Sequence, residues 1–386
     1  MVWINALVLL ILLAGHCEAT VTAVNRLHAL RFPGPVLKAV RHTHDVWMLT
    51  FPPLLLWKVG FTGPAVLLGG YWFDLSGGWQ AYLSVCLLGA AGLAFTAVRY
   101  QLRRPPAAQL SNHSRSVDVV ERLGRRPLGP GPYQTLARLP GNEIFQIEVT
   151  HKTLQLPRLP AEWDGLNVLH LSDLHFIGTL DLPFFEEVTR LSLEQQADLI
   201  VFTGDLLDKQ RLVEWLPSTL GKLSAPLGCY FILGNHDWYL EPEPIRQAMV
   251  DLGWRDVSGR TAAIEHRGHR LAIGGSERPW MGQQPDFSET PAGAFRLLLS
   301  HTPDNVSWAR REQVDLMLSG HNHGGQVVLP LFGPVYSPSV YGCKYAAGTF
   351  WQPPTILHVS RGISGRHPLR WRCRPELTRL TLRTPK

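Results

Sequence analysis

Acidic and imidazole side chains recur in short groups between residues 173 and 323. They offer oxygen and nitrogen ligands and no thiolate, a set that suits divalent manganese, iron or zinc. The candidates are Asp173, His175, Asp205, Asp208, Asn235, His236, Asp237, His301, His321 and His323. So many ligands exceed the needs of one tetrahedral zinc ion. They predict a site for two divalent metal ions (manganese, iron or zinc) that share a bridging ligand.

A pair of metal ions has a known use in phosphate chemistry. The anionic oxygens of a phosphoester repel a nucleophile, and two cations offset that charge and lower the pKa of a bound water toward neutrality. The leaving alkoxide also needs a proton, which a histidine paired with a carboxylate can supply near neutral pH. These residue types therefore favour hydrolysis of a phosphate ester or anhydride without a covalent intermediate.

The candidate ligands follow short apolar runs that are typical of buried strands. These runs are 166–171, 199–203, 229–233, 295–299 and 314–318. Further strands are expected at 144–149, at 271–274 and in the tail from 327 to 382, and helices at 182–196 and 212–223. Open α/β sheets carry their sites beyond the carboxyl ends of the strands, so we expect an α/β fold that directs two layers of sheet at one site.

The polar groups at these strand ends match a known series of motifs. The chain resembles the calcineurin-like metallophosphoesterases, and from Gly320–Gln326 and Ser360–Gly362 most resembles the bacterial membrane-associated branch of that family. The five motifs, in order, are Asp173-Leu174-His175, Gly204-Asp205-Leu206-Leu207-Asp208, Gly234-Asn235-His236-Asp237, His301 and Gly320-His321-Asn322-His323. The resemblance covers about residues 145–386 and implies a metallophosphoesterase-type two-sheet β-sandwich flanked by helices.

The same resemblance implies a role for each matching residue. The first metal ion falls to Asp173, His175 and His323. The second falls to Asn235, His301 and His321, and Asp205 bridges both ions. His236 is expected to face the phosphate as acid and charge stabiliser, Asp208 to orient that imidazole, and Asp237 to support the loop.

The substrate is left open by the motifs. Protein phosphatases of the family carry Arg-Gly after the second motif, whereas this chain has Lys209-Gln210, which counts against a protein substrate. A phosphodiester, phosphomonoester or pyrophosphate substrate is expected, and a nuclease or cyclic-nucleotide phosphodiesterase is a further alternative. The chain also resembles enzymes that cleave the pyrophosphate of UDP-linked diacylglucosamine. A different class of function is a non-enzymatic, metal-stabilised membrane scaffold.

The first hundred residues differ in composition from the rest. Charged residues make up 18% of the whole chain, below the typical value of about 25%. Apolar stretches occur at 2–14, extendable to 24, at 47–70 and at 79–98, and they predict a helical transmembrane region over residues 1–100. The second stretch contains Lys58 and three prolines. Because residues 1–4 lack Lys and Arg, a retained anchor is expected in place of a signal peptide.

A Pro-, Gly- and Arg-rich linker is expected over residues 101–143, and the metallophosphoesterase domain over 144–386. The net charge of +6 arises largely beside the apolar stretches, which fits a membrane surface better than a nucleic acid. If all three stretches cross, the positive-inside rule predicts a multi-pass protein of a bacterial inner membrane with a cytoplasmic catalytic domain. If the second does not cross, the sidedness stays open, as does the oligomeric state.

Overall fold

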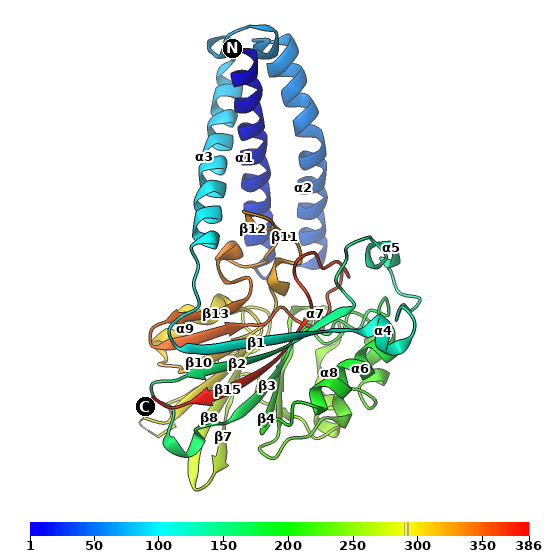
Figure 1. The fold of residues 1–386 in the computed structure, drawn as a ribbon, viewed down its shortest axis with the longest axis vertical. Coiled ribbons are helices and arrows are strands. Elements are labelled where there is room, and N and C mark those ends of the chain that lie inside the picture. Colours follow the sequence, from blue (N-terminus) through cyan, green and yellow to red (C-terminus); the bar gives the residue numbers. More distant parts are fainter. Residues whose placement is uncertain (289, 292, 386) are drawn as a thin grey trace. The chain divides into compact units, whose positions relative to one another are not determined.

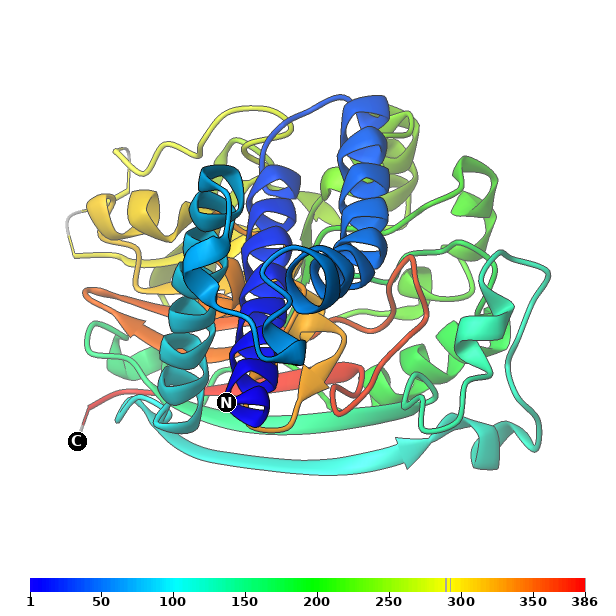
Figure 2. The ribbon, with the colours of Figure 1, turned by 90° about the horizontal axis from the view of Figure 1, so that it is seen from above.

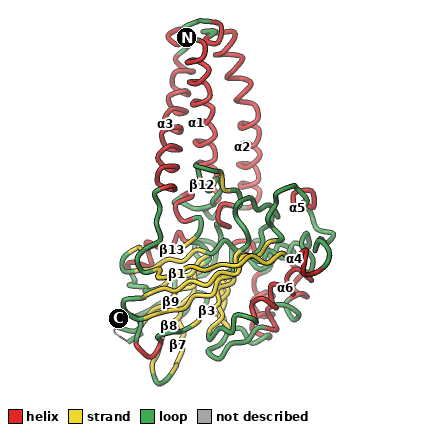
Figure 3. The backbone as a smooth tube through the Cα atoms, in the orientation of Figure 1, coloured by secondary structure: helices red, strands yellow, loops and turns green. Residues whose placement is uncertain are grey.

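The computed structural model describes residues 1–288, 290–291 and 293–385. The chain divides into two compact units. The helical unit contains Met1–Arg103 together with Leu329–Gly342, and the sheet unit contains Arg104–Val328 together with Cys343–Lys386. Helices make up most of the first unit, and strands and loops most of the second (Figure 1, Figure 3). The α/β class with two sheets, expected from the sequence, is confirmed.

The sheet unit is built on a seven-stranded and a six-stranded sheet. The first sheet, in spatial order, has β1 (Gln109–Asp118), β2 (Gln146–Gln155), β15 (Glu376–Arg383), β3 (Asn167–Leu171), β4 (Leu199–Thr203), β5 (Cys229–Ile232) and β6 (Arg255–Asp256). The second has β13 (Gly348–Gln352), β14 (Thr355–Val359), β10 (Leu316–Ser319), β9 (Phe295–Ser300), β8 (His269–Ser276) and β7 (Thr261–His266). A further two-stranded sheet pairs β11 (Val328–Leu329) with β12 (Gly333–Pro334).

The two large sheets pack face to face. Their shared core contains Val168, Val201 and Ile232 from the first sheet and Leu297 and Leu316 from the second, all buried. Burial on both faces explains why these strands are continuous apolar runs. Within the first sheet β3, β4 and β5 run parallel, and in the second β9 and β10 do. Parallel strands end at one edge, which is where the predicted ligands lie.

Helices cover the outer face of the first sheet (Figure 1). The helices of this unit are α4 (Val119–Leu123), α5 (Gln134–Ala137), α6 (Leu182–Leu193), α7 (Asn235–Trp238), α8 (Pro242–Asp251) and α9 (Val306–Arg311). In α6 the side chain of Asp181 accepts from the Phe184 amide, and Pro183 stands in the first turn, both favourable at a helix start. Its apolar face buries Phe184 and Val188 against the sheet.

Two parts of this unit differ from the sequence prediction. The linker expected at 101–143 contains strand β1, which pairs antiparallel with β2 along its length. Most β1 side chains are exposed, so the strand lacks the apolar alternation that would have identified it. The helix expected at 212–223 is wrong. Two short 3₁₀ turns, Gln210–Trp215 and Leu220–Lys222, occur there, because Pro217 and Gly221 interrupt the helical pattern.

The helical unit has three long elements, α1 (Val2–His28), α2 (Gly34–Leu55) and α3 (Gly77–Gln101). Figure 2 looks down on them and shows α1 between α2 and α3. Helices α1 and α3 are long and apolar enough to cross a membrane. Helix α2 does not meet the same criteria of length and hydropathy. It begins at Gly34 within a charged segment, well before the apolar stretch at 47–70. After Pro52 and Pro53 it continues as a π-helix, Leu56–Thr62.

Candidate metal centre

The predicted site residues lie beyond the carboxyl ends of five parallel strands. Asp173 and His175 follow β3, Asp205 and Asp208 follow β4, and Asn235 and His236 begin α7 after β5. His301 follows β9, and His321 and His323 follow β10. The apolar strands are fixed in the core, so the polar loops between strand and helix are free to carry the chemistry.

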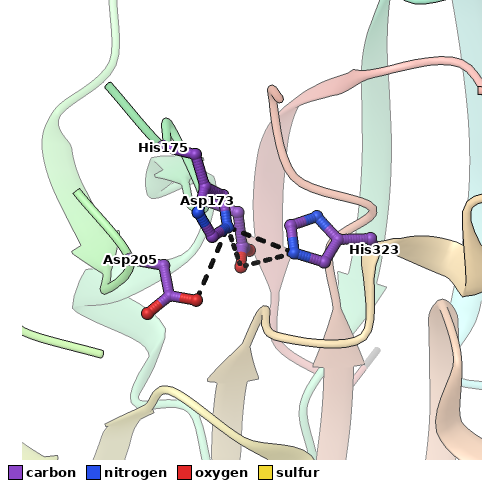
Figure 4. A group of neighbouring side chains, drawn as sticks. All are labelled: Asp173, His175, Asp205 and His323. Atoms are coloured by element: carbon purple, nitrogen blue, oxygen red, sulfur yellow. Dashed lines mark hydrogen bonds and ion pairs between the residues drawn. The ribbon is translucent and has the colours of Figure 1, made fainter. Parts of the chain in front are cut away.

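A first group of ligand atoms is formed by Asp173, His175, Asp205 and His323, whose side chains point toward one another in Figure 4. The His175 and His323 Nε2 atoms are 3.2 Å apart. The His175 Nε2 also lies 3.5 Å from Asp205 Oδ2 and 3.9 Å from Asp173 Oδ1. The three side chains from the first sheet are almost fully buried, and His323 retains 13% exposure.

A second group is formed by Asp205, His301 and His321, with Asn235 beside them. The His301 Nε2 lies 3.3 Å from Asp205 Oδ2, 3.0 Å from Asn235 Oδ1 and 3.1 Å from His321 Nδ1. The same Oδ2 atom of Asp205 therefore faces both groups. Its other oxygen accepts from the His236 backbone amide at 2.8 Å, which fixes the orientation of the carboxylate.

The first group fits a cation because its facing atoms are acceptors. The His175 Nδ1 is 2.9 Å from Asp208 Oδ2, an oxygen that can only accept, so this nitrogen donates and the His175 Nε2 presents its lone pair to the Asp173 and Asp205 carboxylates. The His323 Nδ1 lies 3.1 Å from the Ser364 carbonyl oxygen and 3.3 Å from Arg370 Nη2, and its Nε2 faces the His175 Nε2 and Asp173 Oδ1. Such a convergence is repulsive by itself and favourable around a divalent metal ion.

The His236 imidazole forms a pair with the buried Asp208. Its Nδ1 donates to Asp208 Oδ1 at 2.6 Å, while Asp208 Oδ2 holds His175. Burial alone would raise the pKa of Asp208, but the His236 and His175 imidazoles hold that pKa well below its usual value. Burial alone would lower the pKa of His236, but the Asp208 and Asp205 carboxylates raise it to about 9. The His236 side chain is 19% exposed and is thus open to a substrate.

The backbone around the site is held in an unusual conformation. Five of the candidate ligands, Asp173, His175, Asp205, His321 and His323, have positive φ angles between 47° and 69°. Positive φ in such residues is rare and tends to gather at functional sites. Close packing accompanies it, since a Cβ atom at Gly320 would lie 1.9 Å from Ser172 Oγ and 2.2 Å from Asp173 Oδ2. Glycine is required there so that the loop after β10 can approach the loop after β3.

The Asp237 side chain is fully buried and bonds to backbone amides of two loops of the site. Its buried carboxylate accepts from the backbone amides of Leu206, Leu207 and Gly234. It thereby ties the loop after β4 to the loop after β5, and burial raises its pKa to about 6. These contacts match the support role expected from the sequence.

Some residues beside the site were not predicted. The buried Trp280 ring lies 4.9 Å from the His321 ring and 5.6 Å from the His301 ring. The buried Arg370 donates to the His323 carbonyl at 2.9 Å and to Ser364 O, the same oxygen that orients His323. Their positions depend on packing between distant segments, which the sequence does not reveal. The nearest motif is the Ser-Arg-Gly at 360–362, which indicates the family resemblance and gives no role to either residue.

Comparison with known proteins identifies related chains. The family model described as calcineurin-like phosphoesterase matches residues 166–325. An uncharacterized metallophosphoesterase, YkuE of Bacillus subtilis (strain 168), is 32% identical over 252 residues, which cover 63% of this chain and 87% of the relative. The phosphodiesterase YaeI of Escherichia coli (strain K12) is 31% identical over 220 residues, covering 56% and 81%. A UDP-2,3-diacylglucosamine pyrophosphatase, LpxG of Chlamydia muridarum (strain MoPn / Nigg), is 26% identical over 288 residues, covering 60% and 88%.

Proposed function

Because the chain belongs to the calcineurin-like metallophosphoesterase family, and is thus a metal-dependent phosphoric ester hydrolase, we propose that it cleaves a phosphodiester or pyrophosphate by a two-metal mechanism. The observation that carries the proposal is the shared oxygen of Asp205, which faces the two groups of ligand atoms at 3.5 and 3.3 Å. One carboxylate between two groups is the arrangement that a pair of ions requires.

In this proposal Asp173, His175 and His323 would hold the first ion, and Asn235, His301 and His321 would hold the second. Asp205, whose Oδ2 faces both groups, would serve both ions. When bound, the two ions supply Lewis-acid polarisation of a phosphate oxygen and make a water molecule acidic near neutral pH. The neutral imidazoles are oriented for this task by their second nitrogens, such as the His301 Nδ1, which donates to the Thr203 carbonyl at 2.8 Å.

His236 is proposed to act on the substrate directly. Its Nδ1 is engaged by Asp208, so its remaining nitrogen is the one available to a phosphate oxygen or to the leaving oxygen. The raised pKa of His236 keeps a proton on that nitrogen near neutral pH. The protonated ring can stabilise developing negative charge and then give its proton to the leaving group. Asp208 acts through His236 and is a positioning residue.

A second candidate is a more specific version of the first: hydrolysis of a lipid-linked pyrophosphate. It is favoured by the similarity to the pyrophosphatase LpxG and by the two apolar helices α1 and α3. The non-enzymatic scaffold is disfavoured, because such a protein is expected to lack the bridging carboxylate or the acid. This chain has both, as Asp205 and His236.

We also propose that the helical unit crosses the membrane three times. Helices α1 and α3 run in the same direction, since Asn5 receives a hydrogen bond from Trp72 before α3, while Gly15 packs at Cys86 and Gly89 farther along both helices. Two parallel crossings require the chain between them to return. Helix α2 does so antiparallel to α1, with Met48 beside Thr20 and Phe51 beside His16.

This proposed topology assigns a side to the sheet unit. The ends of α1 and α3 and the start of α2 carry basic residues, which are Arg26, Arg31, Lys38, Arg41, Arg99 and Arg103. The positive-inside rule then assigns this end, from which the chain continues into the sheet unit, to the cytoplasm. Protease digestion of inside-out membrane vesicles should remove the sheet unit, and digestion of spheroplasts should leave it intact. The reverse pattern would overturn the assignment.

The hydrolase proposal is tested on the full chain in detergent micelles, stripped of metal and then supplied with manganese, iron or zinc. Hydrolysis of bis-p-nitrophenyl phosphate, p-nitrophenyl phosphate and a UDP-linked diacylglucosamine is measured. We expect turnover only with metal, and about a 10² to 10³-fold lower kcat in His236→Ala. Preference for the UDP-lipid would select the second candidate, whereas preference for the small diester would select a general phosphodiesterase.

The matched control is His113→Ala, which removes an exposed histidine on β1. It should retain full activity and full metal content. His236→Ala should also retain its metal, because its side chain belongs to neither proposed ligand set. Equal activity of the His236→Ala and His113→Ala proteins would contradict the assigned role of His236.

A further inference from the structure

The segment 329–342 belongs to the helical unit, although in the chain it lies between two parts of the sheet unit. It begins six residues after the proposed ligand His323 and contains no charged residue. At its start, strands β11 and β12 pair with each other, and the turn between them, residues 330–332, is the tip of the segment. We refer to residues 329–342 as the docked hairpin.

Hydrogen bonds fasten the docked hairpin to the ends of α1 and α3. The buried Asn25 side chain on α1 donates to the Val335 carbonyl and accepts from the Ser337 amide, both at 3.1 Å. Gln101 on α3 donates to the Leu331 carbonyl at 2.9 Å. An asparagine that bonds to both a carbonyl and an amide of one short segment fixes the position of that segment along α1, so the docking is not a loose contact.

Aromatic and cationic contacts complete the docking. The Arg41 guanidinium of α2 lies 5.4 Å from the centre of the Tyr336 ring, and the His28 ring lies 6.3 Å from it. A Cβ atom at Gly333 would lie 2.7 Å from the Tyr100 ring of α3, so the hairpin backbone is packed against that ring. All three helices therefore contact the hairpin at the same end of the helical unit.

The tip of the docked hairpin exposes large apolar side chains. Leu331 is 69% exposed and Phe332 is 44% exposed, and Leu102, which follows the hairpin contact Gln101 at the end of α3, is 73% exposed. Exposed apolar side chains grouped at one place mark an interaction surface. The surrounding segments 26–41 and 99–103 hold six Lys and Arg residues and no Asp or Glu. Apolar side chains bordered by basic ones match the boundary between acyl chains and anionic lipid headgroups.

The length of α3 gives the depth of this surface. Helix α3 has 25 residues, or about 37 Å at 1.5 Å per residue, against about 30 Å for the hydrocarbon core of a bilayer. Tyr100 and Gln101 at its end therefore fall in the interfacial layer if the helix crosses. Because Gln101 and Tyr100 hold the hairpin, its tip falls in the same layer.

We propose that the docked hairpin is a membrane-interface contact, in which Leu331 and Phe332 insert between the headgroups of an anionic leaflet. The proposal rests on the proposed crossing of α1 and α3 and is independent of the hydrolase mechanism. The six residues from His323 to the start of the docked hairpin span at most about 20 Å when extended. Insertion of the tip would therefore restrict how far the loop that carries His323 can move from the bilayer surface.

The test places one environment-sensitive fluorophore on the full chain in vesicles of phosphatidylglycerol and phosphatidylcholine. The five native cysteines are replaced by alanine, and single cysteines are introduced as Leu331→Cys, Leu88→Cys or Arg270→Cys. Leu88 is 74% exposed on α3 and reports the membrane interior, and Arg270 is exposed on β8 and reports water. Quenching by lipids carrying a doxyl group at carbon 5 or 12 and by aqueous iodide is measured.

We expect the label at 331 to be quenched most by the carbon-5 doxyl lipid and at least fivefold less by iodide than the label at 270. Quenching by iodide equal to that at 270 would overturn the proposal. Weak quenching by both probes would also overturn it, because the tip would then be covered by protein, such as a second copy of the chain. If the label at 88 is not quenched by doxyl lipids, the crossing of α3 itself is wrong, which separates the two failures.

Discussion

The helical unit and the metal centre of the sheet unit use their buried polar side chains in opposite ways. In the helical unit, three buried polar side chains bond to groups of neighbouring segments: Asn5 donates to the Val66 carbonyl, the His16 Nδ1 bonds to the Tyr82 hydroxyl, and Asn25 holds the docked hairpin. At the metal centre, the buried His175 Nε2 and the carboxylates of Asp173 and Asp205 converge as acceptors, and the Nε2 of the partly exposed His323 faces them. Paired groups tie segments together, whereas converging acceptors require an ion from outside the chain.

This comparison separates the roles of the units. If it is right, changes at the converging acceptors should abolish catalysis and leave the helices intact, and changes between the helices should loosen that unit and leave the chemistry intact.

The largest effect is expected for Asp205→Ala. Its Oδ2 faces both groups of ligand atoms, so its removal should weaken both proposed ion sites at once. We expect kcat to fall at least about 10³-fold, with fewer metal ions bound per chain by elemental analysis. The exposed Asp251 at the end of α8 provides the matched control, Asp251→Ala, which should behave as the parent chain. Full metal content in Asp205→Ala would show that the carboxylate does not bridge.

A smaller loss is expected for Asp208→Asn, because this carboxylate acts through two imidazoles. It should lower kcat by about 10² with little change in KM, since the raised pKa of His236 depends on its charge. In a double-mutant cycle the same substitution should cost much less when His236 is already alanine. Additive losses in the double variant would mean that Asp208 supports the metal ligand His175 in place of His236.

The sequence predicted the strand ends that carry the candidate ligands far better than it predicted the elements around them. Strand β4 begins and ends at the predicted residues, Leu199 and Thr203, and the ligands follow their strands as expected. Such prediction works because metal ligands are few residue types at narrow spacing and because buried parallel strands are continuous apolar runs. The assigned metal roles remain proposals, but the structure brings all of those side chains together.

Elements defined by long-range packing could not be predicted. Strand β1 is largely polar and is a strand only because β2 lies beside it. The docked hairpin lies more than 200 residues from the helix ends that hold it, as the pair of Asn25 and Val335 illustrates. A boundary between the units at Arg103, in place of a linker to residue 143, follows from such contacts and not from composition.

A stability effect of a few kcal/mol is expected from the buried His170, which lies behind the site and bonds to Thr203 Oγ1 at 2.9 Å. Burial lowers its pKa to about 3, against about 6.5 in the unfolded chain. A depressed histidine pKa favours the folded state above pH 6.5, and this contribution is lost as the pH falls toward 3. Between these values the loss is about 1.4 kcal/mol per pH unit.

The measurement is urea unfolding of the metal-free chain in detergent between pH 7.5 and 5, followed by near-ultraviolet circular dichroism. The glutamine in His170→Gln cannot take up a proton. The free energy of unfolding of this variant should therefore fall less steeply with decreasing pH than that of the parent chain, and the difference in slope should correspond to about one proton. Comparing the two metal-free proteins cancels the titration of the histidines that do not contact His170; His358, whose Nδ1 lies 3.2 Å from the His170 Nδ1, is therefore replaced by glutamine in both proteins. Parallel pH dependences would mean that His170 is protonated in the folded state.

The smallest effect on catalysis is expected from a change between the helices. A Cβ atom at Gly15 on α1 would lie 1.7 Å from the Cys86 carbonyl oxygen of α3, so Gly15→Leu must force the two helices apart. Gly92→Leu is its matched control on α3, because a Cβ atom there meets nothing within 4 Å. Because overpacking a core costs on the order of 1 to 3 kcal/mol, Gly15→Leu should lower the thermal midpoint of the helical unit in detergent by several degrees. The kcat for a small soluble diester should stay within about twofold of the parent value. Suppose instead that kcat falls tenfold in Gly15→Leu and not in Gly92→Leu, with the metal content unchanged. Helix packing would then affect the metal centre, and the separation of roles between the units would be wrong.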